Sequence, residues 1–300
     1  MTLSRPVRTA IFASRRCITS SARCAEPRTP AADEDEAAVC LQEEAVSMER
    51  VKTGIAGLDE MLHGGFLPLT ANVVEGAPGT GKTTLGMQFI YSGIVQYNEP
   101  GIILTFEEFP QQYYRDAASF GWDFRALEAE GKLRVIMTSP EVTRRDLESM
   151  GGIIESMAEE IGAKRILVDS LSHFERLTRD PIELRSLQYS FINALKREGL
   201  TAVITHETPT LFGQTTEGDM NLAFVADSYI LLRYVEIDSA VHKALLVLKL
   251  RGSDHAKDIR RFEITPRGIE VQSKFEGREG IMSGSPRRMA EYFEQAFVKR

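Results

Sequence analysis

The sequence has very little cysteine, and all of it lies near the beginning. The 300 residues include only Cys17, Cys24 and Cys40, and the stretch from Met48 to Arg300 has none. This distribution excludes a disulfide framework and a cysteine-based metal site from the body of the protein. It suits a reducing compartment, so we expect a cytoplasmic protein.

Long hydrophobic runs and an excess of positive charge are missing as well. No apolar run approaches the roughly 18–20 residues of a membrane span, so we expect no transmembrane segment. The net charge of −7 argues against a partner held by bulk attraction to a polyanion. The sequence does have 43% hydrophobic and 26% charged residues, which provides enough apolar material for a globular core.

Residues 1–47 differ from the rest of the chain. Met1–Cys24 has arginines and serines but no acid, and an acidic cluster follows at Asp33–Glu36. Prolines interrupt the stretch and no helical or strand periodicity is visible, which predicts a disordered extension. Two alternatives stay open. Such a start is also typical of organelle transit peptides, and translation could instead begin at Met48.

From Met48 onward, strand and helix patterns alternate. The strand-like runs are continuous and rich in Ile, Leu and Val, which is typical of parallel strands covered on both faces. These runs are Ala71–Val74, Gly101–Phe106, Leu133–Met137, Arg165–Val168 and Leu200–Thr205. Helical patterns occur at Leu85–Ile94, Arg145–Ile161 and Pro181–Arg197.

After about Asp227 the strand pattern becomes alternating, which predicts antiparallel strands. These strands are Tyr229–Val235, Ala244–Leu250, Arg261–Ile264 and Ile269–Val271. We therefore predict a three-layer α/β fold over residues 48–275, with a mostly parallel sheet extended by antiparallel strands. Residues 276–300 are expected to form a tail with a short amphipathic helix, because Pro286–Arg300 places apolar residues at helical spacing.

Residues 76–83, Gly-Ala-Pro-Gly-Thr-Gly-Lys-Thr, match the phosphate-binding pattern G-x4-G-K-[ST]. Glycines let successive backbone N–H groups turn toward a phosphate chain, and the following helix directs its positive end to the same anion. Lys82 adds a positive charge, and the Thr83 hydroxyl can bind Mg²⁺. The alternative is a glycine-rich turn without a ligand. We predict a nucleotide site formed by Gly76, Ala77, Pro78, Gly79, Thr80, Gly81, Lys82, Thr83 and Thr84.

Acidic residues follow two other expected strands. Asp169 comes directly after Arg165–Val168, at the strand end where open α/β sheets bind ligands, and we expect it to help hold Mg²⁺. A helix cap is the alternative role. Glu107 and Glu108 end another strand, and crowding of two carboxylates tends to raise the pKa of one of them, which helps it accept a proton. The alternative is an acidic start to a loop before Pro110.

Taken together, these motifs resemble the KaiC family of RecA-superfamily ATPases over about residues 48–288, a length of one domain. The resemblance implies a RecA-like P-loop NTPase fold with ATP and Mg²⁺ as ligands. The matching segments are Thr53–Asp59, Gly64–Phe66, the P-loop, Thr105–Glu108, Ile204–Glu207, Leu248–His255, Phe275–Gly277 and Ile281–Pro286.

The resemblance also implies roles for individual residues. Glu107 is expected to be the general base, with Glu108 supporting it. Lys249 and Arg251 match family positions whose cations reach the nucleotide of the neighbouring subunit, and His255 matches a histidine of the same group. Such an arrangement predicts a closed ring, a homo-hexamer, whose hydrolysis depends on assembly.

We therefore expect a slow ATPase that acts as a nucleotide-dependent switch for a regulatory protein partner, and three other activities are alternatives. An autokinase is disfavoured because the resemblance to the second domain of tandem KaiC proteins, which phosphorylates itself on adjacent Ser and Thr, places Ala223 and Phe224 at those positions, and neither has a hydroxyl. A DNA-dependent motor is disfavoured because Glu207–Leu232 has no Lys or Arg, so we expect no nucleic-acid partner. A nucleotide sensor that does not hydrolyse stays open.

Overall fold

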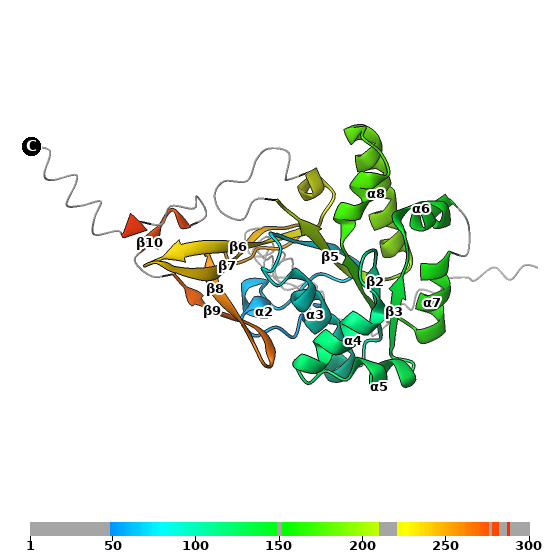
Figure 1. The fold of residues 1–300 in the computed structure, drawn as a ribbon, viewed down its shortest axis with the longest axis horizontal. Coiled ribbons are helices and arrows are strands. Elements are labelled where there is room, and N and C mark those ends of the chain that lie inside the picture. Colours follow the sequence, from blue (N-terminus) through cyan, green and yellow to red (C-terminus); the bar gives the residue numbers. More distant parts are fainter. Residues whose placement is uncertain (1–48, 149–151, 210–220, 276–277, 282–286, 289–300) are drawn as a thin grey trace, which may run out of the picture. The chain divides into compact units, whose positions relative to one another are not determined.

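Within the residues that the structure describes, 49–148, 152–209, 221–275, 278–281 and 287–288, a nine-stranded mixed sheet forms the centre of the fold (Figure 1). The structure is a computed structural model. The order across the sheet is β3-β2-β4-β5-β1-β6-β7-β8-β9. The strands are β1 (Ala71–Gly76), β2 (Gly101–Thr105), β3 (Leu133–Met137), β4 (Arg165–Asp169), β5 (Thr201–Glu207), β6 (Ser228–Ile237), β7 (Ala240–Leu250), β8 (Arg260–Thr265) and β9 (Gly268–Lys274).

Neighbouring strands are parallel from β3 to β6 and antiparallel from β6 to β9. The mostly parallel sheet with an antiparallel extension is therefore confirmed. The sequence pattern predicted that Tyr229–Val235 pairs only with antiparallel strands. This is wrong on one side of β6, where the strand pairs parallel with β1. The first six residues of β6 are all buried, because its side chains pack on both faces of the sheet: Ile230 lies in the cluster on one face and Tyr229 in the cluster on the other.

Helices cover both faces of the sheet, which confirms the three layers (Figure 1). Side chains alternate along each strand: Val73 packs in the cluster on one face and Val74 in the cluster on the other. The cluster with Val74 includes residues of α2 (Leu58–Met61), α3 (Lys82–Tyr97), α4 (Pro110–Ser119) and α5 (Phe124–Ala129). The cluster with Val73 includes residues of α7 (Ile153–Ile161), the 3₁₀ helices η1 (Leu171–Arg176) and η2 (Asn221–Phe224), and α8 (Pro181–Arg197).

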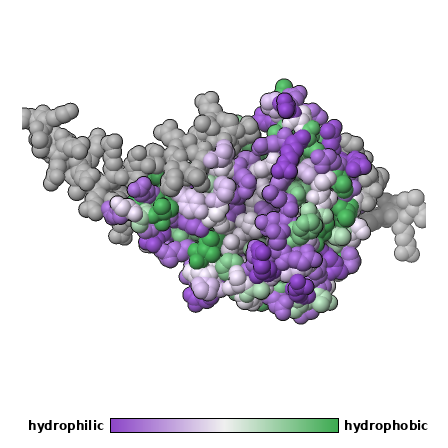
Figure 2. Space-filling model, in the orientation of Figure 1, coloured by the Kyte–Doolittle hydropathy of each residue, from purple (hydrophilic) through white to green (hydrophobic). Residues whose placement is uncertain are grey.

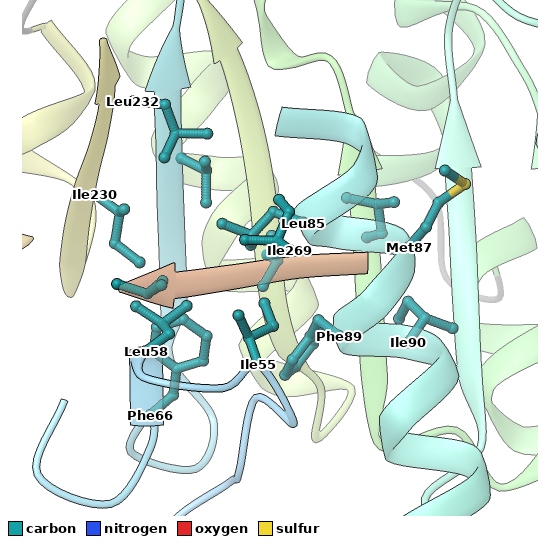
Figure 3. Close-up of a cluster of buried hydrophobic side chains, with 14 of the residues drawn as sticks. Ile55, Leu58, Phe66, Leu85, Met87, Phe89, Ile90, Ile230, Leu232 and Ile269 are labelled. Atoms are coloured by element: carbon teal, nitrogen blue, oxygen red, sulfur yellow. The ribbon is translucent and has the colours of Figure 1, made fainter. Parts of the chain in front are cut away.

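The last strand of the antiparallel extension, β9, packs against α3, the helix that follows the P-loop. Figure 3 shows Ile269 of β9 beside Leu85, with Leu58 and Phe66 of the N-terminal segment near the same cluster. The Gln88 side chain acts as a strand partner, because its Oε1 accepts a hydrogen bond from Ile269 N at 2.6 Å and its Nε2 donates to the Ile269 carbonyl at 3.3 Å. This contact links the first half of α3 to a strand about 180 residues further along the sequence.

Two expected elements differ in the structure. The single helix expected over Arg145–Ile161 is two helices, α6 (Pro140–Glu148) and α7, because Gly152 adopts an extended conformation as the N-cap of α7 and glycine disfavours a helix interior. A short helix was also expected within Pro286–Arg300. Two of these residues, Arg287 and Arg288, instead form the strand β11, which pairs with β10 (Arg278–Glu279), and the other residues of the expected helix lie outside the described residues.

The surface view in Figure 2 shows hydrophobic residues in small separate areas among hydrophilic ones. Within the described ranges, no helix combines the length and apolarity needed to cross a membrane.

Candidate active site

The predicted phosphate, magnesium and proton-accepting groups lie along one edge of the sheet. The strands β2, β4, β5 and β1 are consecutive neighbours and all parallel, so their carboxyl ends meet at the same edge. The P-loop follows β1, Glu207 ends β5, Asp169 ends β4, and Glu107 follows β2. The fold therefore gathers groups from segments more than 100 residues apart in the sequence.

The P-loop has the backbone conformation that its glycines allow. Gly79 and Gly81 have φ angles of +77° and +111°, which side chains with a Cβ rarely adopt. A Cβ at Gly81 would also come within 2.9 Å of Ile264 Cδ1. From the β6–β7 hairpin, Tyr234 Oη donates to the Pro78 carbonyl at 3.4 Å, and Lys243 Nζ donates to the Gly79 carbonyl at 2.9 Å. Sequence analysis did not identify these two supporting residues.

Lys82 begins α3 and is only 6% exposed. Its Nζ donates to the Ala77 carbonyl at 3.1 Å and lies 3.6 Å from Glu207 Oε1. Burial lowers the pKa of the Lys82 ammonium, against the opposing attraction of Glu207 and Asp169. A phosphate chain bound by the loop would compete with Glu207 for this ammonium group.

Asp169 is held through both of its carboxylate oxygens. Tyr113 of α4 donates its hydroxyl to Oδ2 at 2.8 Å, and the Thr205 hydroxyl donates to Oδ1. Thr83, the other expected magnesium ligand, lies half-buried in the first turn of α3. Thr205 lies within the family-like segment Ile204–Glu207, whereas nothing in the sequence pattern pointed to Tyr113.

The donor set at this edge fits Mg²⁺. Asp169 offers a carboxylate and Thr83 a hydroxyl, both hard oxygen donors. Among the described residues, no group of three or more His, Cys, Asp or Glu side chains could hold a metal ion. Mg²⁺ does not require one, because it is usually bound through one or two carboxylates together with substrate phosphates and water.

Glu107 and Glu108 differ in their surroundings. The Thr105 hydroxyl accepts hydrogen bonds from both of their backbone N–H groups, at 3.3 and 3.1 Å. The Glu107 side chain is 68% exposed, and its Oε2 lies 3.1 Å from His173 Nε2. Burial, with the negative charges of Asp169, Asp116 and Glu107, raises the pKa of the Glu108 carboxyl. The crowding by Glu107 that was expected from the sequence is thus the smallest of the effects that raise the pKa of Glu108, and burial is the largest.

Lys249 and Arg251 lie at the other end of the sheet from the P-loop. Lys249 Nζ donates to the carbonyls of Ala223 and Ala226, both at 2.8 Å. Arg251 is 57% exposed, and its Nη1 lies 3.6 Å from Asp227 Oδ1. The second Asp227 carboxylate oxygen accepts a hydrogen bond from the backbone N–H of Ala71, the first residue of β1, at 2.9 Å.

The P-loop begins at Gly76, the last residue of β1, about 17 Å away along the strand. This span exceeds the length of an arginine or lysine side chain, so neither cation reaches the phosphate loop of its own subunit. His255 lies further along, in a segment tied to the N-terminal region by Ala256 N, which donates to the Met61 carbonyl at 2.8 Å. At the two positions that the family resemblance implies for autophosphorylation, Ala223 is half-buried and Phe224 is 69% exposed.

A buried charged cluster lies directly behind the P-loop, and sequence analysis missed it. Glu75 precedes Gly76 and is fully buried. It accepts hydrogen bonds from Arg233 Nη2, at 2.7 Å, and from the Tyr229 hydroxyl. His206 lies between two carboxylates, with Nδ1 3.6 Å from Glu75 and Nε2 3.5 Å from Glu175. The one available signal in the sequence was an acid, Glu75, directly between the apolar run Ala71–Val74 and the P-loop.

This cluster predicts a pH-dependent stability. Burial by itself lowers the pKa of His206, but Glu175 and Glu75 outweigh that effect and raise the pKa to about 8. The pKa of His206 in the folded protein is thus higher than the value of about 6.5 in the unfolded chain. The protonated imidazole therefore stabilises the fold fully below about pH 6.5, and this stabilisation is lost as pH rises through 8. We expect the free energy of unfolding to fall by roughly 2 kcal/mol between pH 6.5 and 9.

Urea unfolding across this pH range measures the effect. His206→Gln should remove most of the decrease, whereas His242→Gln on β7, the matched control, should retain it. The Glu75 and Glu175 carboxyls do not titrate in this window, because their pKa values are lowered from a value already near 4.5. The same decrease in the His206 variant would contradict the assignment.

The chain is similar in sequence to known proteins of one family. The family model described as the KaiC ATPase matches residues 51–276. The chain is 35% identical over 251 residues to circadian clock protein KaiC3 of Synechocystis sp., and the match covers 84% of this chain and 48% of that protein. It is 37% identical over 241 residues to circadian clock oscillator protein KaiC of Nostoc sp., covering 80% and 46% respectively.

The chain thus spans about half the length of these clock relatives. UPF0273 protein MJ1359 of Methanocaldococcus jannaschii, by contrast, is matched over nearly its full length. The chain is 34% identical to it over 241 residues, and the match covers 75% of this chain and 96% of that protein. The resemblance to a single domain of the family, stated from the motifs, is confirmed.

Proposed function

The chain belongs to the KaiC family of ATPases, and on that premise we propose that it binds ATP with Mg²⁺ and hydrolyses it within a ring of identical subunits. The observation that carries this proposal is the convergence at one sheet edge of the P-loop, Asp169 and the pair Glu107–Glu108. These are the groups that a phosphoryl transfer to water requires.

In this proposal the main-chain N–H groups of the P-loop and Lys82 hold the phosphates. Thr83 and Asp169 hold Mg²⁺, which when bound neutralises charge on the β and γ phosphates. Glu107 accepts a proton from a water molecule whose oxygen bonds to the γ phosphorus. The bond from that phosphorus to the β–γ bridging oxygen breaks, and ADP and inorganic phosphate leave.

The position of Lys249 and Arg251, about one strand length from their own P-loop, supports a shared site. In a head-to-tail ring each subunit presents these cations to the next subunit's nucleotide, and they stabilise negative charge in the transition state. A hexamer is the proposed ring size. We further propose a cytoplasmic protein whose nucleotide state switches a regulatory protein partner.

The experiment is ATP binding and phosphate release by the purified full chain, with and without Mg²⁺. We expect wild type to bind ATP and release phosphate. Lys82→Ala should weaken ATP affinity roughly 10- to 100-fold, because it removes a charged hydrogen-bond donor. Lys164→Ala, which changes an exposed lysine before β4, is the matched control and should bind as wild type.

The outcomes separate the alternatives. Equal ATP affinity in Lys82→Ala and wild type would contradict the P-loop site. Binding without phosphate release would favour a nucleotide sensor over an ATPase. Native mass measurement in the same buffers tests the ring, and a monomer at all nucleotide conditions would contradict it.

A further inference from the structure

The short helix η1 connects the groups of the candidate active site. It begins two residues after Asp169, and three of its side chains contact the ends of the strands on either side of β4. Ser172 Oγ accepts a hydrogen bond from the backbone N–H of Glu207 at 2.8 Å, and Glu175 lies 3.5 Å from His206. The third contact joins His173 to Glu107, 3.1 Å from Nε2 to Oε2.

His173 and Glu107 differ in how tightly their side chains are packed. His173 is 9% exposed, its backbone N–H donates to the Ser170 carbonyl, and its ring lies 6.3 Å from the ring of Phe106. Phe106 in turn packs edge-on against Phe174, with 5.6 Å between ring centres. Glu107, by contrast, extends into solvent. A fixed imidazole therefore contacts a side chain that otherwise has many rotamers available.

The chemistry of the contact defines its direction. An ionised carboxylate only accepts hydrogen bonds, so the imidazole can stabilise Glu107 through this contact only when Nε2 carries the N–H that faces Oε2. Oε1 of Glu107 is left to accept a proton from water. Because the His173 ring is packed against Phe106, its contact with Oε2 limits the positions that Oε1 can take.

We propose that His173 is a positioning residue for Glu107: it fixes the exposed carboxylate in the orientation that accepts the proton of the attacking water. This inference rests on the proposed ATPase function. The water oxygen bonds to the γ phosphorus, the proton moves to Glu107 Oε1, and ADP departs with the bridging oxygen. His173 does not contact the nucleotide in this role and does not change its charge.

The test compares two substitutions of one residue. His173→Phe keeps an aromatic ring against Phe106 but removes the donor, whereas His173→Gln keeps an N–H donor of similar reach. We expect His173→Phe to lower kcat about 10- to 100-fold with KM for ATP within about twofold of wild type, because the base is misplaced but the nucleotide site is intact. His173→Gln should recover most of the lost rate.

A double-mutant cycle separates positioning from general damage. In a Glu107→Gln background, His173→Phe should change kcat by less than about twofold, because the group that it positions is already inactive. An equal fall in both backgrounds would overturn the proposal. So would an unchanged kcat in His173→Phe, or a raised KM with unchanged kcat.

A second readout does not depend on hydrolysis. The chain has five histidines, so ¹⁵N-histidine labelling of the sedimented full-length protein gives a small set of ring signals, and His173→Phe assigns one of them. Glu107→Ala should shift the His173 ring nitrogens and leave the other four residues unchanged, and unchanged His173 signals would overturn the contact. An inactive wild type with Glu107-dependent His173 signals would reject both the ATPase function and the catalytic consequence of the contact, while keeping the contact itself.

Discussion

Arg251→Ala is expected to lower ATP turnover about a thousandfold or more while leaving ATP binding at the variant's own P-loop nearly unchanged. An arginine supplied to a phosphoryl-transfer site stabilises the charge that spreads over the transferred group. In this chain Arg251 lies beside Asp227, at the opposite end of β1 from its own P-loop. The loss should therefore appear in kcat and at the neighbouring subunit's site.

Arg251 is a cleaner test than Lys249 because of its contacts. Lys249 donates to two backbone carbonyls of its own subunit and is partly buried, so its removal would also disturb the start of β6. Arg251 is more than half exposed and contacts Asp227 at a longer distance. Its substitution removes less of the subunit's internal bonding.

Mixing two inactive variants tests whether the site is shared. The Arg251→Ala subunit keeps Glu107 and the P-loop, and the Glu107→Gln subunit keeps Arg251. An interface therefore has all of these groups when an Arg251→Ala subunit binds the nucleotide and a Glu107→Gln subunit supplies the arginine. After dissociation and random reassembly at equal amounts, about a quarter of the interfaces should be active. The matched control mixes Arg251→Ala with the double variant Glu107→Gln/Arg251→Ala and should stay inactive. Absence of recovery in the first mixture would contradict supply of Arg251 across an interface.

The fold was largely predictable because its elements leave local patterns. Continuous apolar runs such as Ile166–Val168 indicate strands buried on both faces, and P-loop glycines have a defined spacing. The order of strands across the sheet follows from packing, which no local pattern contains. This is why β6 was assigned to the antiparallel part although one of its edges pairs with β1. Helices α4 and α5, between β2 and β3, were not expected at all.

The candidate site divides in the same way. Groups at strand ends, such as Asp169 and Glu107, were expected together because parallel strands bring their carboxyl ends to one edge. The residues that hold them were not expected, because each comes from a distant segment: Tyr113 contacts Asp169 across 56 positions, and Tyr229 contacts Glu75 across 154. A single tyrosine on a helix gives no sequence signal of the carboxylate that it will contact.

The second large effect is expected at Glu107. Glu107→Gln should lower kcat about 100- to 10,000-fold, because it removes the group that accepts the proton of the attacking water. ATP affinity should stay within a few-fold of wild type, since Lys82 and the P-loop carry binding. Steady-state phosphate release at saturating ATP measures the first quantity, and equilibrium titration with a fluorescent ATP analogue measures the second. The variant should therefore accumulate bound ATP.

Glu108→Gln is the matched control, because it changes the neighbouring carboxylate by the same atoms. Burial and nearby negative charges raise the pKa of the Glu108 carboxyl, and its backbone N–H donates to the same Thr105 hydroxyl as that of Glu107. If Glu108 supports Glu107 through its charge and packing, its substitution should cost about tenfold in kcat, well below the loss at Glu107. A larger loss in Glu108→Gln would assign proton acceptance to the residue with the raised pKa. The contact between His173 and Glu107 would then have to be explained without a role in orienting the base.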